Sequence, residues 1–173
     1  MSYNYKSAKN ALRGRQNRAE GNAFEEIIER SCAYYREKGI AHIEKTPEPF
    51  KVIGAPNNRG QFAGYFTKQA QPDFKGVLHG GRCIVFDAKC TSTDKIPTSA
   101  LTDTQRDTLT QYKQLGAESG VLMCFKFAAY YYLPIDTFLN AKELNGHQWW
   151  TIQDCIRQTL PLPYNNKVYF IKE

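Results

Sequence analysis

Long apolar runs, paired cysteines and clustered histidines are all missing from this sequence. No apolar run approaches the roughly 18–20 residues of a membrane-spanning helix, and the N-terminus has no apolar signal-peptide core. We therefore expect a cytoplasmic protein that does not associate with membranes. The five cysteines never form a C-x-x-C pair, so we expect reduced thiols. His42, His79 and His147 stand alone, without the spacing of zinc ligands.

Acidic residues are also missing from residues 1–19, and the first one in the chain is Glu20. This segment holds five of the basic residues that contribute to the net charge of +6, namely Lys6, Lys9, Arg13, Arg15 and Arg18. We expect residues 1–19 to form a basic, flexible N-terminal arm beside a single domain over residues 20–173. Such an arm attracts polyanions, of which nucleic acid is the commonest. The alternative is a solvated tail that only aids solubility.

The rest of the sequence has the composition and periodicity of one folded domain. The chain has 173 residues, 42% of them hydrophobic and 13% aromatic, which fits a globular protein. Apolar spacing and turn residues predict helices at 20–38, 101–115, 136–143 and 149–158, and strands at 41–47, 49–54, 61–68, 73–78, 82–90, 120–128, 130–135 and 167–173. This order favours an α/β or α+β protein with a central mixed β-sheet flanked by helices.

The stretch QPDFKGVLHGGRCIVFDAKC, residues 71–90, carries the residues that indicate chemistry. Side chains alternate across a strand, so Asp87 and Lys89 share a face at the end of an apolar run. A turn at residues 79–81 would place Asp73 opposite Asp87, and two carboxylates so close repel each other. Mg²⁺ or Mn²⁺ would remove the repulsion and could promote phosphodiester hydrolysis, with Lys89 orienting water or stabilising charge. The alternative is an ordinary salt-bridged hairpin.

Two further polar residues are candidates for the same site. Glu25 lies on the flank of the apolar stripe of the first predicted helix, from which it could project towards the sheet edge. Gln105 lies near the start of the helix that follows the loop after Lys89. Each also has an ordinary interpretation. Glu25 would be a solvated helical glutamate, and Gln105 a surface residue beside a helix N-cap.

These motifs occur in an order that resembles a known family. The segments GNAFEEI, PDFKG and FDAK, a helix with a glutamine, and then GVLMCFKF and YYYLP are similar to the RecU-type Holliday junction resolvases of the PD-(D/E)XK nuclease superfamily. AYYREKGIAHIEKTPEP is similar to the family's YY helix and its Lys-x-Pro-x-Pro motif. The resemblance extends from about Gly21 to about Pro134. It implies an α/β, restriction-endonuclease-like core.

The resemblance also implies an activity and the residues that carry it. It implies a homodimer that uses Mg²⁺, with Mn²⁺ able to substitute, and nicks two opposing strands of a four-way DNA junction in recombination and repair. The implied metal ligands are Asp73 and Asp87, and the other implied catalytic residues are Lys89, Gln105 and Glu25. The implied DNA contacts are the basic residues of the arm together with Arg59 and Lys68, in and beside a stalk around residues 53–66.

The chain departs from the family pattern in three places. Asp87 stands where close members have Glu, Pro72 replaces a common Thr, and the stalk segment is short. Two alternatives therefore stay open, a nuclease of the same fold that acts on other branched DNA and a junction-binding protein without catalysis. The complete set of Asp73, Asp87 and Lys89 argues against the second, because unpaired carboxylates would repel DNA.

Overall fold

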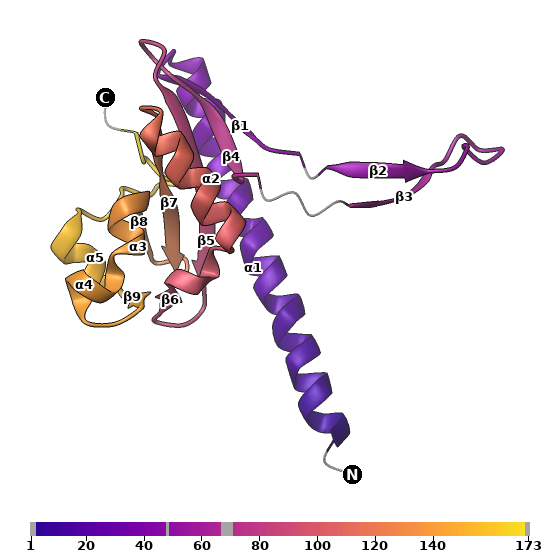
Figure 1. Ribbon diagram of the computed structural model, residues 1–173, viewed down its shortest axis with the longest axis horizontal. Helices are drawn as coiled ribbons and strands as arrows, with labels where there is room; N and C mark the ends of the chain where they lie inside the picture. Colours follow the sequence, from indigo (N-terminus) through magenta and orange to yellow (C-terminus); the bar gives the residue numbers. More distant parts are fainter. Residues whose placement is uncertain (1–2, 48, 67–70, 172–173) are drawn as a thin grey trace.

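A five-stranded mixed sheet forms the centre of the computed structural model, which describes residues 3–47, 49–66 and 71–171 (Figure 1). The strand order is β1-β4-β5-β7-β8. These strands are β1 (Ala41–Lys45), β4 (Phe74–Leu78), β5 (Cys83–Thr91), β7 (Glu118–Phe125) and β8 (Ala129–Pro134). The β5 and β7 strands are parallel, and the other neighbours are antiparallel. Every residue of β7 after Glu118 is buried, as are residues 84–87 of β5, which agrees with the apolar runs in both strands.

Helices cover both faces of this sheet. The long helix α1 (Tyr3–Glu37) packs its apolar residues, such as Phe24 and Ile28, against one face. Helices α2 (Asp103–Gln114) and α3 (Ile135–Leu139) cover the other face, where Leu109 and Phe138 are completely buried. The predicted α/β class with a central mixed sheet flanked by helices is confirmed.

Helix α1 is much longer than the sequence pattern predicts. Most of the segment expected to be a flexible arm is helical, since α1 begins at Tyr3 and runs without a break to Glu37. Its N-terminal half extends beyond the sheet (Figure 1). This half holds several Ala, Arg and Lys residues, which favour helix, and Gln16 Nε2 donates to Glu20 Oε1 over 2.9 Å. It has no apolar stripe, so periodicity detects the helix only from about residue 20.

A second hairpin projects from the sheet into solvent (Figure 1). We call it the outer hairpin; it consists of β2 (Phe50–Ile53) and β3 (Ala63–Phe66), which pair with each other and with no other strand in the described part of the chain. Its apolar side chains are exposed, including Ile53 at 57% and Tyr65 at 49%. This is the segment that the sequence interprets as a short stalk.

The C-terminal region differs from the prediction in two places. The Trp149–Trp150 pair, predicted to be helical, is a short strand β9 that pairs with β6 (Ile96–Pro97), and the helix α5 begins only at Ile152. Within the described part of the tail, the predicted strand at 167–173 is also wrong. Only an isolated bridge joins Tyr164 and Val168 there.

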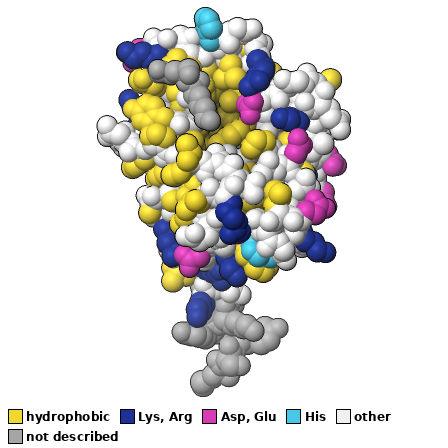
Figure 2. All heavy atoms as spheres, turned by 90° about the vertical axis from the view of Figure 1, so that its left-hand side faces the viewer, with side chains coloured by type: hydrophobic (Ala, Val, Ile, Leu, Met, Phe, Trp, Pro, Cys, Tyr) yellow, Lys and Arg dark blue, Asp and Glu magenta, His cyan; other side chains and the backbone are white. Residues whose placement is uncertain are grey.

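The same tail closes part of the core. Val168 is fully buried and Phe170 nearly so, both against the face that α1 covers. The face that carries the C-terminal region shows apolar side chains between scattered charged ones (Figure 2). No helix among the described residues is long and apolar enough to span a membrane.

Candidate active site

The hairpin of β4 and β5 places the two candidate acids opposite each other. We call it the acidic hairpin. Phe74 pairs with Phe86, which sets Asp73 across from Asp87. The turn follows Leu78, where the sequence predicts it. The geometric prediction is therefore confirmed, while the catalytic roles of these residues stay predictions.

Backbone amides of the facing strand hold both carboxylates in place. The Asp73 N–H donates to Asp87 Oδ1 over 3.1 Å, and the Ala88 N–H donates to Asp73 Oδ2 over 2.9 Å. The Asp87 side chain is completely buried. Each carboxylate is thus fixed by the strand that carries the other, and the two form a single rigid unit.

Lys89 completes a compact charged group. It lies two residues after Asp87, so its side chain projects from the same face of β5. Its ammonium nitrogen lies 3.2 Å from Asp87 Oδ2, and the Lys89 side chain is 19% exposed. The group therefore reaches from the buried acid towards the surface, where a ligand can contact the lysine.

Burial and mutual repulsion make the acid pair hard to ionise. Burial, reinforced by the charge of Asp87, raises the pKa of Asp73 to about 6. Burial also raises the pKa of Asp87, although the charge of Lys89 acts in the opposite direction. The single ammonium does not fully compensate two buried carboxylates. A bound cation would compensate their charge, because it favours the ionised form of both carboxylates.

The donor set of the acid pair fits a magnesium ion. Among the described residues, no group of three or more His, Cys, Asp or Glu side chains is placed to hold a metal. Mg²⁺ does not need a group of three such side chains, since it keeps several waters and is usually held by one or two carboxylates together with phosphate oxygens. Asp73 and Asp87 could hold such an ion, and the remaining positions would be filled by water and substrate.

Glu25 lies close enough to influence the acids, but its side chain is paired elsewhere. Its charge contributes to the raised pKa of both Asp73 and Asp87. Its Oε2 lies 2.7 Å from Lys45 Nζ, and Glu29 lies 3.4 Å from the same nitrogen. The hydrogen bond with Glu25 is the main reason that the pKa of Lys45 is raised. Sequence reasoning missed Lys45, although it stands in the Lys-x-Pro-x-Pro motif.

Gln105 adopts the ordinary role that the sequence left open. Thr102 is the N-cap of α2 and its hydroxyl accepts from the Gln105 N–H over 3.2 Å. In return, Gln105 Oε1 accepts from the Thr102 N–H over 3.0 Å. This is a capping box. Within the described part of the chain, no hydrogen bond connects the Gln105 side chain to Asp73, Asp87 or Lys89.

The predicted DNA-contacting residues fall on two projecting elements. Four of them are exposed on α1, namely Lys9, Arg13, Arg15 and Arg18. Arg59 is exposed at the tip of the outer hairpin, where its N–H donates to Asn57 Oδ1. The side chain of Lys6 and the whole of Lys68 lie outside the described residues.

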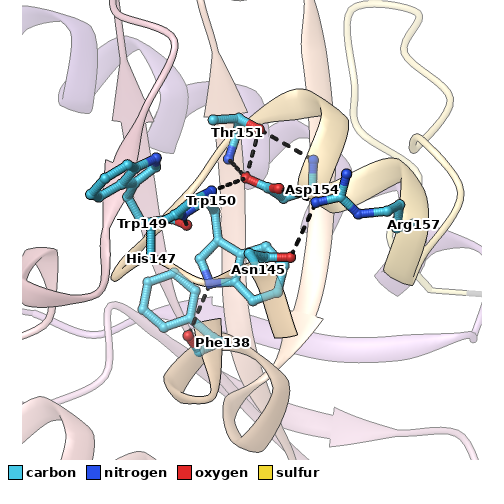
Figure 3. A network of polar contacts seen from close by, with 8 residues as sticks. All are labelled: Phe138, Asn145, His147, Trp149, Trp150, Thr151, Asp154 and Arg157. Atoms are coloured by element: carbon cyan, nitrogen blue, oxygen red, sulfur yellow. Dashed lines mark hydrogen bonds and ion pairs between the residues drawn. The ribbon is translucent and has the colours of Figure 1, made fainter. Parts of the chain in front are cut away.

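A polar network that the sequence did not indicate anchors the C-terminal region (Figure 3). The indole N–H of buried Trp150 donates to the Phe138 carbonyl oxygen over 2.9 Å. Asp154 forms a capping box with Thr151 and an ion pair with Arg157. These residues hold β9 and α5 on the sheet, so the network is structural.

The outer part of this network forms an aromatic stack. His147 stacks on Trp149 with the ring centroids 4.3 Å apart, and the His147 Nε2 lies 3.6 Å from Asp154 Oδ2. The ammonium of Lys95 lies 4.3 Å from the Trp149 ring centroid. The stack therefore links α5 to the loop that follows β5.

Comparison with known proteins identifies relatives over most of the chain. The model of the family RecU, described as Recombination protein U, matches residues 19–170. The Holliday junction resolvase RecU of Pediococcus pentosaceus is 26% identical over 94% of this chain and 85% of its own length. The Holliday junction resolvase RecU of Bacillus pumilus is 27% identical over 88% of this chain and 78% of its own length.

Solved structures also resemble the chain. One is that of Hjc, a Holliday junction resolvase from Archaeoglobus fulgidus. It covers 75% of this chain and 90% of its own, with a TM-score of 0.45 and 15% identity.

Proposed function

The chain belongs to the RecU family, and from this membership and its acidic hairpin we propose that it is a nuclease that resolves Holliday junctions. The curated relatives that support the proposal carry the name of this activity and are matched over most of their length. The substrate would be four-way DNA, and the products would be two duplexes with paired, symmetrical nicks.

The observation that carries the proposal is the buried pair Asp73 and Asp87 with Lys89 beside it. A protein that only binds DNA gains nothing from two buried carboxylates that repel each other and the phosphates. Their ionisation is unfavourable, with the pKa of Asp73 raised to about 6. A site for a divalent cation explains why this arrangement is present.

Each residue of the acidic hairpin would then have a role. Asp73 and Asp87 would hold Mg²⁺, or Mn²⁺ in its place, because the oxygen atoms of carboxylates are the ligands both ions prefer. When bound, the ion would supply polarisation of the phosphate and a lower pKa for an attacking water. Lys89, held by Asp87 at 3.2 Å, would donate to that water or to a phosphate oxygen and stabilise the developing charge.

Paired nicking needs two sites, whereas one chain contains one acidic hairpin. We propose a homodimer, because a two-fold symmetric enzyme matches the two-fold symmetry of a four-way junction. Each protomer would then cut one of two opposing strands. Light scattering at working concentration tests this point, and a monomer that still makes paired nicks would contradict it.

Cleavage of a labelled, immobile four-way junction tests the function. The wild type and Asp73→Asn are compared with Mg²⁺, beside a linear duplex and a fork of matched sequence. We expect symmetrical nicks in the junction only, lost in the variant while binding persists. Equal cutting of all three substrates would leave a nuclease without junction selectivity. Binding without cutting in Mg²⁺ and Mn²⁺ would contradict catalysis.

A further inference from the structure

A groove lies between the N-terminal half of α1 and the loop after β5. This half of α1 extends beyond the sheet into solvent (Figure 1). The volume of the groove is about 760 Å³. Lys9 and Arg13 of α1 form one wall, and Thr91, Ser92, Thr93 and Lys95 form the other. We call it the basic groove. Apart from Lys9 and Arg13, which belong to the predicted basic arm, neither the sequence nor the family match assigns a role to these residues.

All the charges in the basic groove have the same sign. Lys9 and Arg13 are four residues apart, so they lie on one face of the helix, and Lys95 comes from the opposite wall. No acidic residue lines the groove, all of whose residues belong to the described part of the chain. None of the three cations forms an ion pair with another described residue. The charge of the groove is therefore available to a ligand.

The loop wall of the groove is held in one conformation before any ligand binds. The hydroxyls of Thr91 and Thr93 lie 2.8 Å apart, and the Thr93 hydroxyl donates to the Lys95 carbonyl oxygen over 3.2 Å. The loop's one carboxylate, that of Asp94, is paired with Lys126 at 2.5 Å. Because this pairing neutralises Asp94, it leaves a wall of hydroxyl groups and one ammonium.

The ammonium of Lys95 rests on the face of Trp149 at 4.3 Å from the ring centroid. This cation–π contact stabilises the lysine near the groove without neutralising its charge. Trp149 is itself fixed by stacking on His147. Lys95 is therefore positioned where an anion in the groove can attract it.

A DNA strand matches this groove by its chemistry. Cations on both walls suit a chain of phosphates. The hydroxyl of Ser92 and the side-chain amides of Gln16 and Asn17 also line the groove and can donate to phosphate and sugar oxygens. The groove starts at Cys90, the residue after Lys89. From Asp87 to Thr91 the β5 strand advances about 13 Å, which corresponds to about four nucleotides when the rise of about 3.4 Å per phosphate is counted along the helix axis of a duplex.

We propose that the basic groove holds the sugar–phosphate backbone of the DNA strand that continues from the acidic hairpin. The inference rests on the proposed function, since the substrate is the same DNA. It adds a path for that strand and a role for Lys95, and it makes the Lys95–Trp149 contact a reporter of binding. When phosphates attract Lys95, its contact with Trp149 weakens.

The salt dependence of binding tests the groove. Affinity for a labelled four-way junction is measured by anisotropy in EDTA between 50 and 200 mM salt. Each lost phosphate contact reduces the steepness of the plot of log affinity against log salt concentration by about 0.9. Lys95→Ala and Arg13→Ala should therefore each reduce the loss of affinity between 50 and 200 mM salt by about three- to fourfold. Exposed Lys38, which follows the C-terminal end of α1, is the charge-matched control, and Lys38→Ala should leave the slope unchanged. Equal slopes for Lys95→Ala and Lys38→Ala would overturn the proposal.

Tryptophan fluorescence gives a second readout that does not depend on cleavage. The chain has two tryptophans, of which Trp150 is fully buried, so changes in quenching report on Trp149. Adding DNA should change the iodide quenching of the wild type, but not of Trp149→Phe, and only weakly that of Lys95→Ala. An unchanged wild-type signal on saturation with DNA would overturn the role of Lys95.

The two proposals fail in different ways. If the wild type cuts junctions but the slope and the fluorescence do not respond to Lys95→Ala, the groove is wrong and the function stands. If the wild type cuts nothing but both readouts respond, the groove stands as a DNA-binding site and the proposed catalysis is wrong.

Discussion

Two antiparallel hairpins follow each other in the chain and have opposite surroundings. The acidic hairpin pairs on both sides, with β1 on one edge and β7 on the other, and residues 84–87 of its strand β5 are buried. Within the described residues, the strands of the outer hairpin pair only with each other, and their described side chains are exposed. The same local structure is therefore a fixed part of the core in one case and a projecting arm in the other.

The difference indicates which hairpin can support which kind of function. Catalysis requires groups held within a fraction of an ångström, and the sheet around the acidic hairpin supplies that rigidity. An isolated two-stranded hairpin is only marginally stable, so the outer hairpin is suited to adapt to a surface. Its exposed apolar residues, including Ile53 and Tyr65, would be costly to leave in water unless a partner covers them.

The largest expected effect is on cleavage. Asp87→Asn should lower the rate of junction cleavage about 10³-fold, because it removes a charge that is part of the proposed metal site. Thermal stability should stay equal or rise, since the buried carboxylate of Asp87 has a raised pKa and is unfavourable when ionised. Ile53→Ser in the outer hairpin is the comparison, and should change the choice of DNA substrate rather than the chemistry. Near-normal cleavage by Asp87→Asn would contradict the role of the acidic hairpin.

One glycine in each hairpin tests the difference in rigidity. A Cβ at Gly76 of β4 would clash with the backbone carbonyl of His42 in β1, and one at Gly64 of β3 would clash with the Lys51 carbonyl. Gly76→Ala should lower the free energy of unfolding by about 1–3 kcal/mol, because the sheet cannot give way. Gly64→Ala should distort only the outer hairpin and leave the unfolding midpoint almost unchanged. Urea denaturation of both variants measures the two effects. Equal losses in the free energy of unfolding would mean that the two hairpins are coupled.

The acid pair should also make stability depend on pH in an uncommon direction. The folded-state pKa of Asp73 is about 6, above its ordinary value of 3.8, so the folded protein binds more protons than the unfolded chain between these values. The contribution of this group to stability therefore falls as pH rises from about 4 to about 6, by on the order of 2–3 kcal/mol.

Urea unfolding at pH 4 and pH 7, with and without Mg²⁺, measures this contribution. Mg²⁺ should restore stability at pH 7, by about 1–2 kcal/mol at a concentration some tenfold or more above its dissociation constant. Asp73→Asn should show neither this pH dependence nor the response to Mg²⁺. A wild type that is indifferent to Mg²⁺ at pH 7 would argue against a metal at the acid pair.

The parts of the molecule that could be predicted from sequence depend on local signals. The acidic hairpin has a Gly-Gly turn and an apolar run that ends on Asp87, and counting back from the turn places Asp73 correctly. The apolar run of the central strand β7 predicts this strand correctly. These features are encoded within about twenty neighbouring residues, so no knowledge of the rest of the chain is needed.

The parts that could not be predicted depend on contacts between distant segments. Trp149 pairs with Pro97, about fifty residues earlier, and this pairing makes the Trp pair a strand rather than the start of a helix. Lys45 meets Glu25 only because β1 lies against α1. The N-terminal half of α1 has no buried face, so it leaves no periodic signal even though its composition favours helix.

The smallest expected effect is at Gln105, and it tests whether this residue belongs to the catalytic site or only caps α2. If Gln105 acts only in the capping box, Gln105→Ala and Thr102→Ala should each lower the free energy of unfolding by about 0.5–1 kcal/mol and change cleavage equally little. If Gln105 instead contacts DNA or water at the acids, Gln105→Ala should lower the cleavage rate well beyond Thr102→Ala at the same stability. Single-turnover cleavage of the two variants, with their unfolding curves, makes the distinction. A capping role would confine the catalytic charges to the rigid hairpin, whereas a larger loss in Gln105→Ala would extend the site to the start of α2.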